Sequence, residues 1–232
     1  MKKILISAAS KGLGKAMAIY LAKSGYELIL CSRNIENLLA LKNEIKLNNL
    51  NCTISLIAID LTDQVAIQAT LKKLKQSDYP DVIINNLGVY EESTPSSLKI
   101  SDIQSQMELN IYAAISLTNF FIEHLKRKKG QILNIGSVVS HRASKEAAAY
   151  SISKHALKAW NDCLREEMRD FGIKVTAIYP GAMNTSSWDG VEQIKKDKMI
   201  QAEDVAALVN EVLQLGSTTL VEEIRLSPLN FN

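Results

Sequence analysis

The stretch "KILISAASKGLGK", Lys3–Lys15, joins a short apolar run to a glycine-containing loop. This order is typical of a buried strand that leads into a dinucleotide-binding turn. The common fingerprint is G-x-G-x-x-G, but here Gly12 and Gly14 are followed by Met17 where a third glycine would stand. The loop alone therefore leaves two interpretations open, a cofactor loop or an ordinary turn, and residues further along the chain must decide between them.

Short apolar runs alternate with helical patterns along the chain. The expected strands are Lys3–Ser7, Glu27–Cys31, Cys52–Ile59, Val82–Asn85, Gln131–Gly136 and Lys174–Ile178, with Leu220–Leu226 as a seventh. Between them, apolar residues recur at helical spacing, as in Leu38, Leu41 and Ile45 or in Val65, Ile67, Leu71 and Leu74. The alternation predicts an α/β fold, a doubly wound Rossmann fold with a seven-stranded, mostly parallel sheet and helices on both faces. Because no linker or repeat divides the sequence, residues 1–232 are expected to form a single dinucleotide-binding and catalytic domain.

The bulk composition excludes several classes of protein. The chain has 232 residues, of which 47% are hydrophobic and 22% charged, as expected for one soluble domain. Its net charge of +2 is too small to suggest nucleic acid or an anionic membrane as partner, and the basic run Lys126–Lys129 is expected to be a solvated helix end. The first apolar run is too short for a signal peptide, and no apolar run is long enough to span a bilayer. Three cysteines without metal-ligand spacing predict buried free thiols, no metal site and a cytoplasmic location.

Polar residues or glycines follow six of the expected strands. They are Ser7–Gly14, Ser32 and Arg33, Asp60, Asn85–Gly88, Ser137, and Pro180 with Gly181. Since the carboxyl ends of parallel strands meet at one edge of a sheet, these residues are expected to share a ligand-binding crevice.

Three residues carry the expected chemistry. Tyr150 and Lys154 in "YSISK" are four positions apart in a helical stretch from about Glu146 to Arg169, so they share one helix face. A nearby cation favours a phenolate and lowers the tyrosine pKa, which lets such a pair exchange a proton with a carbonyl or alcohol oxygen. Ser137 ends the strand "GQILNIGS" and offers a hydroxyl to an oxygen that gains charge. Taken alone, most Tyr–Lys pairs of this spacing are surface contacts of a helix.

Taken together, these residues resemble the short-chain dehydrogenase/reductase (SDR) family over nearly the whole chain. In that family the phosphate loop reads T-G-x-x-x-G-x-G, and "SAASKGLG" matches it with Ser7 for threonine and Ala8 for the first glycine. "NNLG" is similar to the family's N-N-A-G, and "PGAMNT" to its P-G-x-x-x-T. The family's catalytic set is matched by Asn110, Ser137, Tyr150 and Lys154.

The resemblance implies hydride transfer between a nicotinamide and a carbonyl or alcohol carbon. Tyr150 would be the general acid or base, Ser137 would hold the substrate oxygen, Lys154 would lower the tyrosine pKa and bind the ribose, and Asn110 would steady a water. The cofactor residues implied are Ser7, Ser10, Lys11, Gly12, Leu13, Gly14, Ser32, Arg33, Asp60, Leu61, Asn86, Gly88, Tyr150, Lys154, Pro180, Gly181, Met183 and Thr185. For Asp60 the resemblance implies a bond to the adenine, and the alternative is a helix N-cap, which Thr62 could provide as well.

NADP(H) is favoured over NAD(H) as the cofactor. The second expected strand ends in Ser32 and Arg33 without the acid that usually holds the ribose of NAD, and Lys11 adds a second cation. The arginine guanidinium can donate two hydrogen bonds to phosphate oxygens at once, and the lysine ammonium adds a positive charge. The alternative is a solvated Arg33 paired with Glu36.

The substrate end is less defined by the sequence. Residues 184–201 are expected to form the substrate loop, with Trp188 as a wall, and His141 is either a substrate contact or an exposed loop residue. The substrate is expected to be a 3-oxo or 3-hydroxy acid, a 3-oxoacyl compound or another small carbonyl. A second apolar face on the Tyr150 helix predicts a homodimer or homotetramer. A non-catalytic dinucleotide-binding regulator of the same fold remains an alternative, as does a nucleotide-sugar epimerase or dehydratase, although its substrate region would have little room here.

Overall fold

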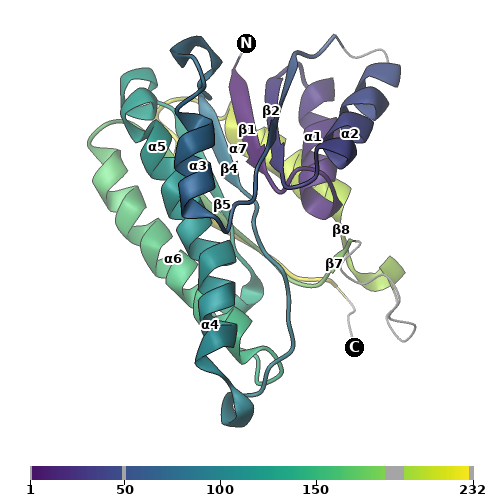
Figure 1. Ribbon diagram of the computed structural model, residues 1–232, viewed down its shortest axis with the longest axis vertical. Helices are drawn as coiled ribbons and strands as arrows, with labels where there is room; N and C mark the ends of the chain where they lie inside the picture. The colour runs from purple at the N-terminus through teal and green to yellow at the C-terminus, as the bar shows by residue number, and fades with distance from the viewer. Residues whose placement is uncertain (1, 49–50, 186–195, 230–232) are drawn as a thin grey trace.

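The computed structural model describes residues 2–48, 51–185 and 196–229 (Figure 1). Its main sheet contains the strands β1 Lys3–Ser7, β2 Glu27–Ser32, β3 Ile54–Ala58, β4 Val82–Asn85, β5 Gln131–Ile135, β6 Lys174–Pro180 and β9 Glu223–Leu226. They are arranged in the order β3-β2-β1-β4-β5-β6-β9, and every pairing is parallel. Two short strands, β7 Met183–Asn184 and β8 Ile200–Gln201, pair separately. The predicted seven-stranded Rossmann-type sheet is confirmed.

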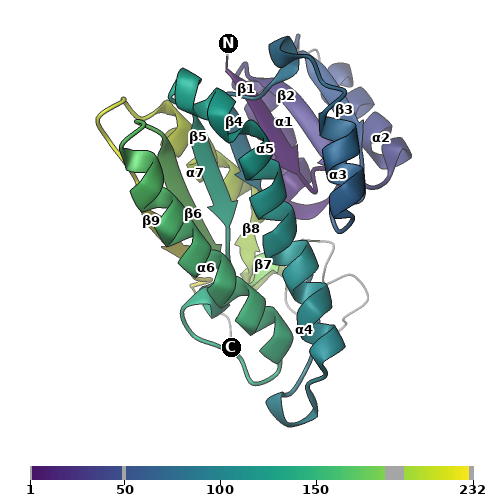
Figure 2. The ribbon, with the colours of Figure 1, turned by 60° about the vertical axis from the view of Figure 1, so that its left-hand side comes forward.

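Helices cover both faces of this sheet. They are α1 Gly12–Lys23, α2 Ile35–Leu47, α3 Gln64–Leu71, α4 Ile100–Met107, α5 Ala113–Lys128, α6 Ala148–Arg169 and α7 Ala202–Gln214. Side chains of α1, α2 and α7 belong to one apolar cluster, and side chains of α3, α5 and α6 belong to another. Figures 1 and 2 show these two groups of helices on opposite sides of the strands. The predicted doubly wound arrangement is therefore confirmed.

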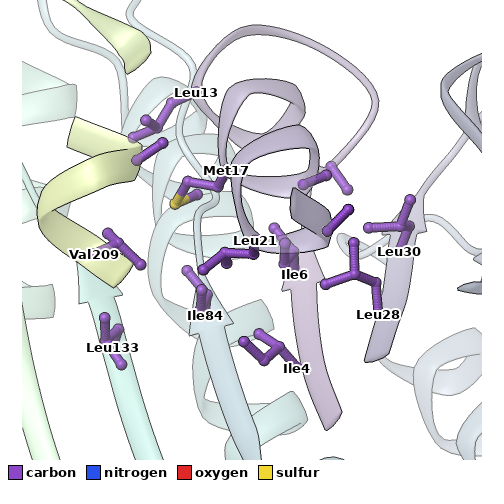
Figure 3. Close-up of a cluster of buried hydrophobic side chains, with 14 of the residues drawn as sticks. Ile4, Ile6, Leu13, Met17, Leu21, Leu28, Leu30, Ile84, Leu133 and Val209 are labelled. Atoms are coloured by element: carbon purple, nitrogen blue, oxygen red, sulfur yellow. The ribbon is translucent and has the colours of Figure 1, made fainter. Parts of the chain in front are cut away.

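The first strand shows why its three central residues, Ile4 to Ile6, are all apolar. Ile4 and Ile6 point into the cluster beneath α1, whereas Leu5 points into the cluster on the other face, and all three are fully buried. Figure 3 shows Ile4 and Ile6 beside Met17 and Leu21 of α1. A strand covered on both faces needs apolar side chains in both directions, which explains a continuous run in place of an alternating one.

The chain order creates a crevice at the carboxyl ends of the strands. β1 lies between β2 and β4, so the chain winds outward from β1 first in one direction and then in the other. In open α/β sheets, ligands bind at such a switch point. Figure 2 shows α4 and one end of α6 extending beyond these strand ends, on the side where β7 and β8 lie. The loops after β1, β4, β5 and β6 thus meet at one edge.

Some sequence-based boundaries and burial predictions were wrong. β9 begins at Glu223 and not at Leu220, and the Val221 carbonyl just before it accepts from the Thr176 hydroxyl at 2.7 Å. Val65 is 79% exposed, since it lies in the first turn of α3 on the side away from the buried Ile67 and Leu71.

The cysteines are free, as predicted, but only Cys31 is fully buried, and Cys163 is exposed on α6. In the described part of the chain, no helix has both the length and the apolar character needed to cross a membrane.

Candidate active site

The turn after β1 uses left-handed backbone at two positions. Ala8 has φ +49° and Gly12 has φ +54°. Glycine adopts this conformation freely, whereas alanine is strained there by about 1–2 kcal/mol. Gly14 has a different constraint, because a Cβ at this position would lie 2.3 Å from the Ala8 carbonyl oxygen. The turn therefore tolerates a strained alanine at its first position and requires glycine where α1 meets the loop.

The start of α1 is prepared for an anion. Lys11 precedes the helix in extended conformation and makes no side-chain cap to the first helical amides. Uncapped N–H groups at a helix N-terminus, together with the helix dipole, favour phosphate. The sequence-based prediction that this loop holds a phosphate is compatible with this geometry.

Ser7 has a different environment from the predicted cofactor contact. Its hydroxyl donates to the Ile84 carbonyl at 3.3 Å and accepts from the Asn86 backbone amide at 2.9 Å, and the residue is fully buried. The Asn86 side chain in turn donates to the Ser7 carbonyl at 3.3 Å. Ser7 therefore joins the end of β1 to the segment after β4, because its hydroxyl donates its one hydrogen and accepts one bond within the protein.

The helix α6 brings Tyr150 and Lys154 to the same edge of the sheet. The Lys154 ammonium lies 5.6 Å from the centre of the Tyr150 ring. It donates to the carbonyl oxygens of Leu87 at 2.9 Å and Ile135 at 3.1 Å, which belong to the segments after β4 and at the end of β5. Both partners are fixed by the sheet, so the lysine is held where the loops meet.

Burial dominates the pKa values of this pair. It lowers the pKa of Lys154 to about 7 and raises the pKa of Tyr150 to about 12. The Ser137 hydroxyl acts in the opposite direction and lowers the tyrosine pKa, while Tyr90 raises it further. The sequence predicted a lowered tyrosine pKa, and the direction is opposite because desolvation of the phenolate is the largest cause of the shift. Tyr150 therefore holds its proton at neutral pH.

Asn110 lies in a π-helical turn, Glu108–Tyr112, between α4 and α5. It is 1% exposed, and its Nδ2 donates to Gln106 Oε1 at 2.8 Å and to Ser153 Oγ at 2.9 Å. Its Oδ1 is buried without a hydrogen-bond partner in the described residues. π-Helical turns are rare and often mark functional positions.

Two adjoining cavities meet at Tyr150. The first, of about 130 Å³, is lined by Ala8, Lys11, Gly12, Leu13, Asn86, Leu87, Gly88, Ile135, Gly136, Tyr150, Lys154, Met183 and Thr185. The second, of about 270 Å³, is lined by Gly88, Tyr90, Ser137, Val138, Val139, Tyr150, Gly181, Ala182, Met183 and Thr185. The structure thus brings most of the predicted catalytic and phosphate-loop residues to one place, although they come from distant parts of the sequence.

Several predicted residues lie away from these two cavities. The predicted cofactor and catalytic residues outside both linings are Ser7, Ser10, Gly14, Ser32, Arg33, Asp60, Leu61, Asn110 and Pro180. Arg33 is exposed after β2, as the alternative of a solvated side chain has it, but no ion pair joins it to Glu36 among the described residues. Asp60 accepts from the Thr62 amide at 2.9 Å, and that bond is the main reason why its pKa is lowered. The cap of α3 is Asp63, so the N-cap alternative for Asp60 or Thr62 was wrong.

The two predicted substrate contacts have different outcomes. His141 is exposed and does not line the second cavity, because its ring packs against Tyr179 at 4.5 Å between centres and lies 3.7 Å from Glu223. Trp188 falls outside the described residues, as does most of the predicted substrate loop.

Tyr90 is a pocket residue that the sequence analysis did not single out. Its ring meets that of Tyr150 edge-on, with 5.7 Å between ring centres. The available signal was its position two residues after Gly88, at a strand end where ligand contacts were already expected.

Known proteins share both the sequence pattern and the fold. A family model described as short chain dehydrogenase matches residues 2–196. The mouse dehydrogenase/reductase SDR family member 7B is 34% identical over 187 residues, which are 79% of this chain and 58% of the mouse protein. An uncharacterized oxidoreductase of Staphylococcus epidermidis is 27% identical over 98% of this chain and 97% of its own length.

A solved structure agrees with these relatives. The alcohol dehydrogenase from the archaeon Thermococcus sibiricus, complexed with 5-hydroxy-NADP, is 26% identical, covers 99% of this chain and 97% of its own, and superposes with a TM-score of 0.89. With a family match over residues 2–196 and the same fold, the chain belongs to the short-chain dehydrogenase family.

Proposed function

We propose that this protein is an NADP(H)-dependent oxidoreductase that transfers hydride between the nicotinamide and the carbonyl or alcohol carbon of a small substrate. The observation that carries the proposal is the position of Tyr150, which borders both the cavity at the phosphate loop and the cavity that contains Ser137. A residue in this position can exchange a proton with a substrate oxygen while the substrate carbon faces the cofactor.

The residues at the first cavity fit a dinucleotide. Gly14 leaves the close approach between loop and helix free of a side chain, and the uncapped start of α1 presents amides. Asn86 and Thr185 add polar groups, and Lys154 adds an ammonium next to Gly88. Lys11, Gly12, Gly14 and Lys154 would therefore hold the bound cofactor, which supplies or accepts the hydride.

The protein's own groups would manage the proton. The Tyr150 phenol is protonated at neutral pH and can act as a general acid when a carbonyl is reduced, and the Ser137 hydroxyl lowers its pKa against the effect of burial. Ser137 lines the same cavity and would donate to the oxygen as charge develops on it. Lys154, held by two carbonyl oxygens, would stabilise the phenolate left by proton transfer.

NADP(H) is the preferred cofactor in this proposal. Arg33 stands exposed directly after β2, where NAD-dependent relatives commonly carry an acid, and Lys11 lies on the loop after the neighbouring strand. Two cations near one position suit a 2′-phosphate. The bound 5-hydroxy-NADP of the Thermococcus sibiricus enzyme supports this preference.

The second cavity favours an uncharged carbonyl compound with an apolar substituent. Its walls include Tyr90, Val138, Val139 and Met183, and no charged side chain is part of its lining within the described residues. Among the expected substrates, a small ketone or aldehyde therefore fits better than a free 3-oxo acid, whose carboxylate would lack a partner here.

Association into a homodimer or homotetramer is part of the proposal. The π-helical turn, α5 and α6 share a small apolar cluster of Ile111, Ala114 and Leu157. Nearby, Tyr112 is 45% and Ile152 43% exposed. Exposed apolar side chains around such a cluster are typical of subunit contacts.

The test is the oxidation of NADPH with a panel of aldehydes, ketones, 3-oxo acids and 3-oxoacyl thioesters. Wild-type protein should turn over at least one uncharged carbonyl, and Tyr150→Phe should bind NADPH normally while losing about 10²–10⁴-fold in kcat. Near-normal turnover in Tyr150→Phe would contradict the role of Tyr150. Tight NADPH binding without turnover of any compound would favour the non-catalytic regulator.

A further inference from the structure

A buried oxygen of Asn110 faces the same small space as the ammonium of Lys154. A Cβ placed on Gly88 would lie 3.1 Å from Lys154 Nζ and 3.5 Å from Asn110 Oδ1, so both atoms border the space beside Gly88. Lys154 uses two of its three N–H donors on the carbonyls of Leu87 and Ile135. The third N–H group of Lys154 is stabilised by a nearby acceptor. Asn110 offers such an acceptor only if its amide turns Oδ1, and not Nδ2, toward Lys154.

An asparagine amide has nearly the same shape when it is turned by 180°, so its partners decide its direction. The Nδ2 of Asn110 meets two acceptors, Gln106 Oε1 and Ser153 Oγ. The Ser153 hydroxyl donates its own hydrogen to the Tyr150 carbonyl at 2.8 Å and has only lone pairs to offer Asn110. Both contacts place the amide nitrogen away from Lys154.

The direction of Gln106 is set in turn by a carboxylate. Gln106 is 1% exposed, and its Nε2 donates to Glu91 Oε2 at 3.0 Å. An ionised carboxylate only accepts hydrogen bonds, so Gln106 must turn its nitrogen toward Glu91 and its oxygen toward Asn110. Glu91 is exposed, in the segment between β4 and α4. The Glu91 carboxylate therefore sets the direction of the Asn110 amide through one buried side chain, that of Gln106.

We propose that Glu91 and Gln106 are positioning residues that fix the direction of the Asn110 amide, so that Asn110 Oδ1 is presented as an acceptor beside Lys154. Glu91 acts at the surface and touches neither cavity, so it is not a catalytic residue. The consequence for turnover rests on the proposed oxidoreductase function, whereas the direction of the amide does not.

The decisive variant reverses the polarity at the surface. In Glu91→Lys the new ammonium only donates, so Gln106 is expected to turn its oxygen outward and to present its nitrogen to Asn110. The Asn110 amide then loses its acceptor on that side or turns its nitrogen toward Lys154. Glu92→Lys is the matched control, because Glu92 is exposed next to Glu91, undergoes the same charge change and has no bond to Gln106.

The first measurement uses the protein without cofactor or substrate. The side-chain amide signals of Asn110, assigned by their loss in Asn110→Ser, are followed by ¹H–¹⁵N NMR together with their exchange with water. Glu91→Lys should shift these signals and speed their exchange at least tenfold, while Glu92→Lys leaves them unchanged. Wild-type signals in Glu91→Lys would overturn the proposal, whatever the enzyme assay shows.

The second measurement separates positioning from a merely structural role. Glu91→Lys should lower kcat by about tenfold, the size of one lost hydrogen bond, with the KM for NADPH and for the carbonyl changed less than twofold. If Glu91 only anchored the segment that carries Tyr90, the KM for the carbonyl would rise instead, and that result would contradict the proposal. The exchanged pair Glu91→Gln/Gln106→Glu restores an acceptor facing Asn110 and should recover the NMR signals and most of kcat.

Discussion

The side-chain nitrogen of Lys154 donates to the carbonyl oxygen of Leu87 at 2.9 Å, across 67 positions of sequence. This bond, with the one to Ile135, fixes a cation that is 1% exposed at the edge of the sheet. Two neutral carbonyl groups do not fully replace the water that a charged ammonium loses on burial. Burial therefore disfavours the protonated form and lowers the pKa of Lys154 to about 7.

Lys154 is expected to make the stability of the fold depend on pH. Its pKa is about 7 in the folded state and near 10.5 in the unfolded chain, so the unfolded chain binds more protons between these values. Stability rises with pH wherever the unfolded state binds more protons. The free energy of unfolding of the wild type should therefore increase relative to Lys154→Met from about pH 7 to 9.5, by up to about 1.4 kcal/mol per pH unit.

Urea denaturation at several pH values measures this difference, and Lys158→Met on the same helix is the control. The pKa of Lys158 is raised, mainly by its hydrogen bond to Asp162, so its contribution is constant over this range. A flat difference for Lys154→Met as well would show that the lysine is charged throughout.

Ala8→Gly is expected to stabilise the protein modestly. It relieves a left-handed alanine, a gain of about 1–2 kcal/mol, and adds backbone freedom to the unfolded chain, a loss of about 0.4–1 kcal/mol. The net gain should be about 1 kcal/mol in urea denaturation. Because the turn already has the required conformation, the Kd for NADPH measured by fluorescence should change less than threefold. A loss of stability would mean that the packing of the Ala8 methyl group outweighs its strain.

Gly14→Ala should damage both the fold and the cofactor loop. The added Cβ would meet the Ala8 carbonyl oxygen at 2.3 Å, a backbone atom that cannot turn away. We expect a loss of about 1–3 kcal/mol in the free energy of unfolding and weaker NADPH binding. Gly216→Ala is the matched control, since a Cβ there meets nothing within 4 Å and its effect should stay within about 0.5 kcal/mol. Equal effects of the two changes would refute the close approach of loop and helix.

Arg33→Ala tests the choice of cofactor. Loss of a charge-assisted contact to the 2′-phosphate should raise the KM for NADPH roughly tenfold or more, while the KM for NADH changes less than threefold. Arg127→Ala, at an exposed position in the last turn of α5, is the control for a general change of charge. A similar rise for both cofactors in Arg33→Ala would count against phosphate recognition.

Much of the fold could be read from local sequence. The strand Lys3–Ser7 has apolar residues at three consecutive positions because both sheet faces are covered, and that pattern identified the strand with its observed bounds. The exposure of Val65 could not be predicted, since an apolar side chain in the first turn of a short helix is compatible with either face until the packing partner is known.

The sequence predicted which residues lie at the site, but it did not predict how deeply they are buried or which side chains pack against them. The spacing of Tyr150 and Lys154 put both on one helix face, Ser137 was predicted from its place at a strand end, and the structure brings these residues to the same edge. The direction of the tyrosine pKa was not predictable, because it depends on how deeply the phenol is buried by segments far away in sequence. The same applies to His141, whose ring is held by Tyr179 and not by the pocket.

The sequence by itself determined which short runs are apolar, where the loop has its glycines, and that Tyr150 and Lys154 share one helix face. Each of these is a local property of a few neighbouring residues. Only the tertiary structure decided that Ala8 adopts φ +49°, that the Ser7 hydroxyl bonds to the segment after β4, and that Glu91 is linked to Asn110 through Gln106. Those outcomes depend on contacts between distant segments, where burial and the direction of hydrogen bonds are set by partners that no local pattern contains.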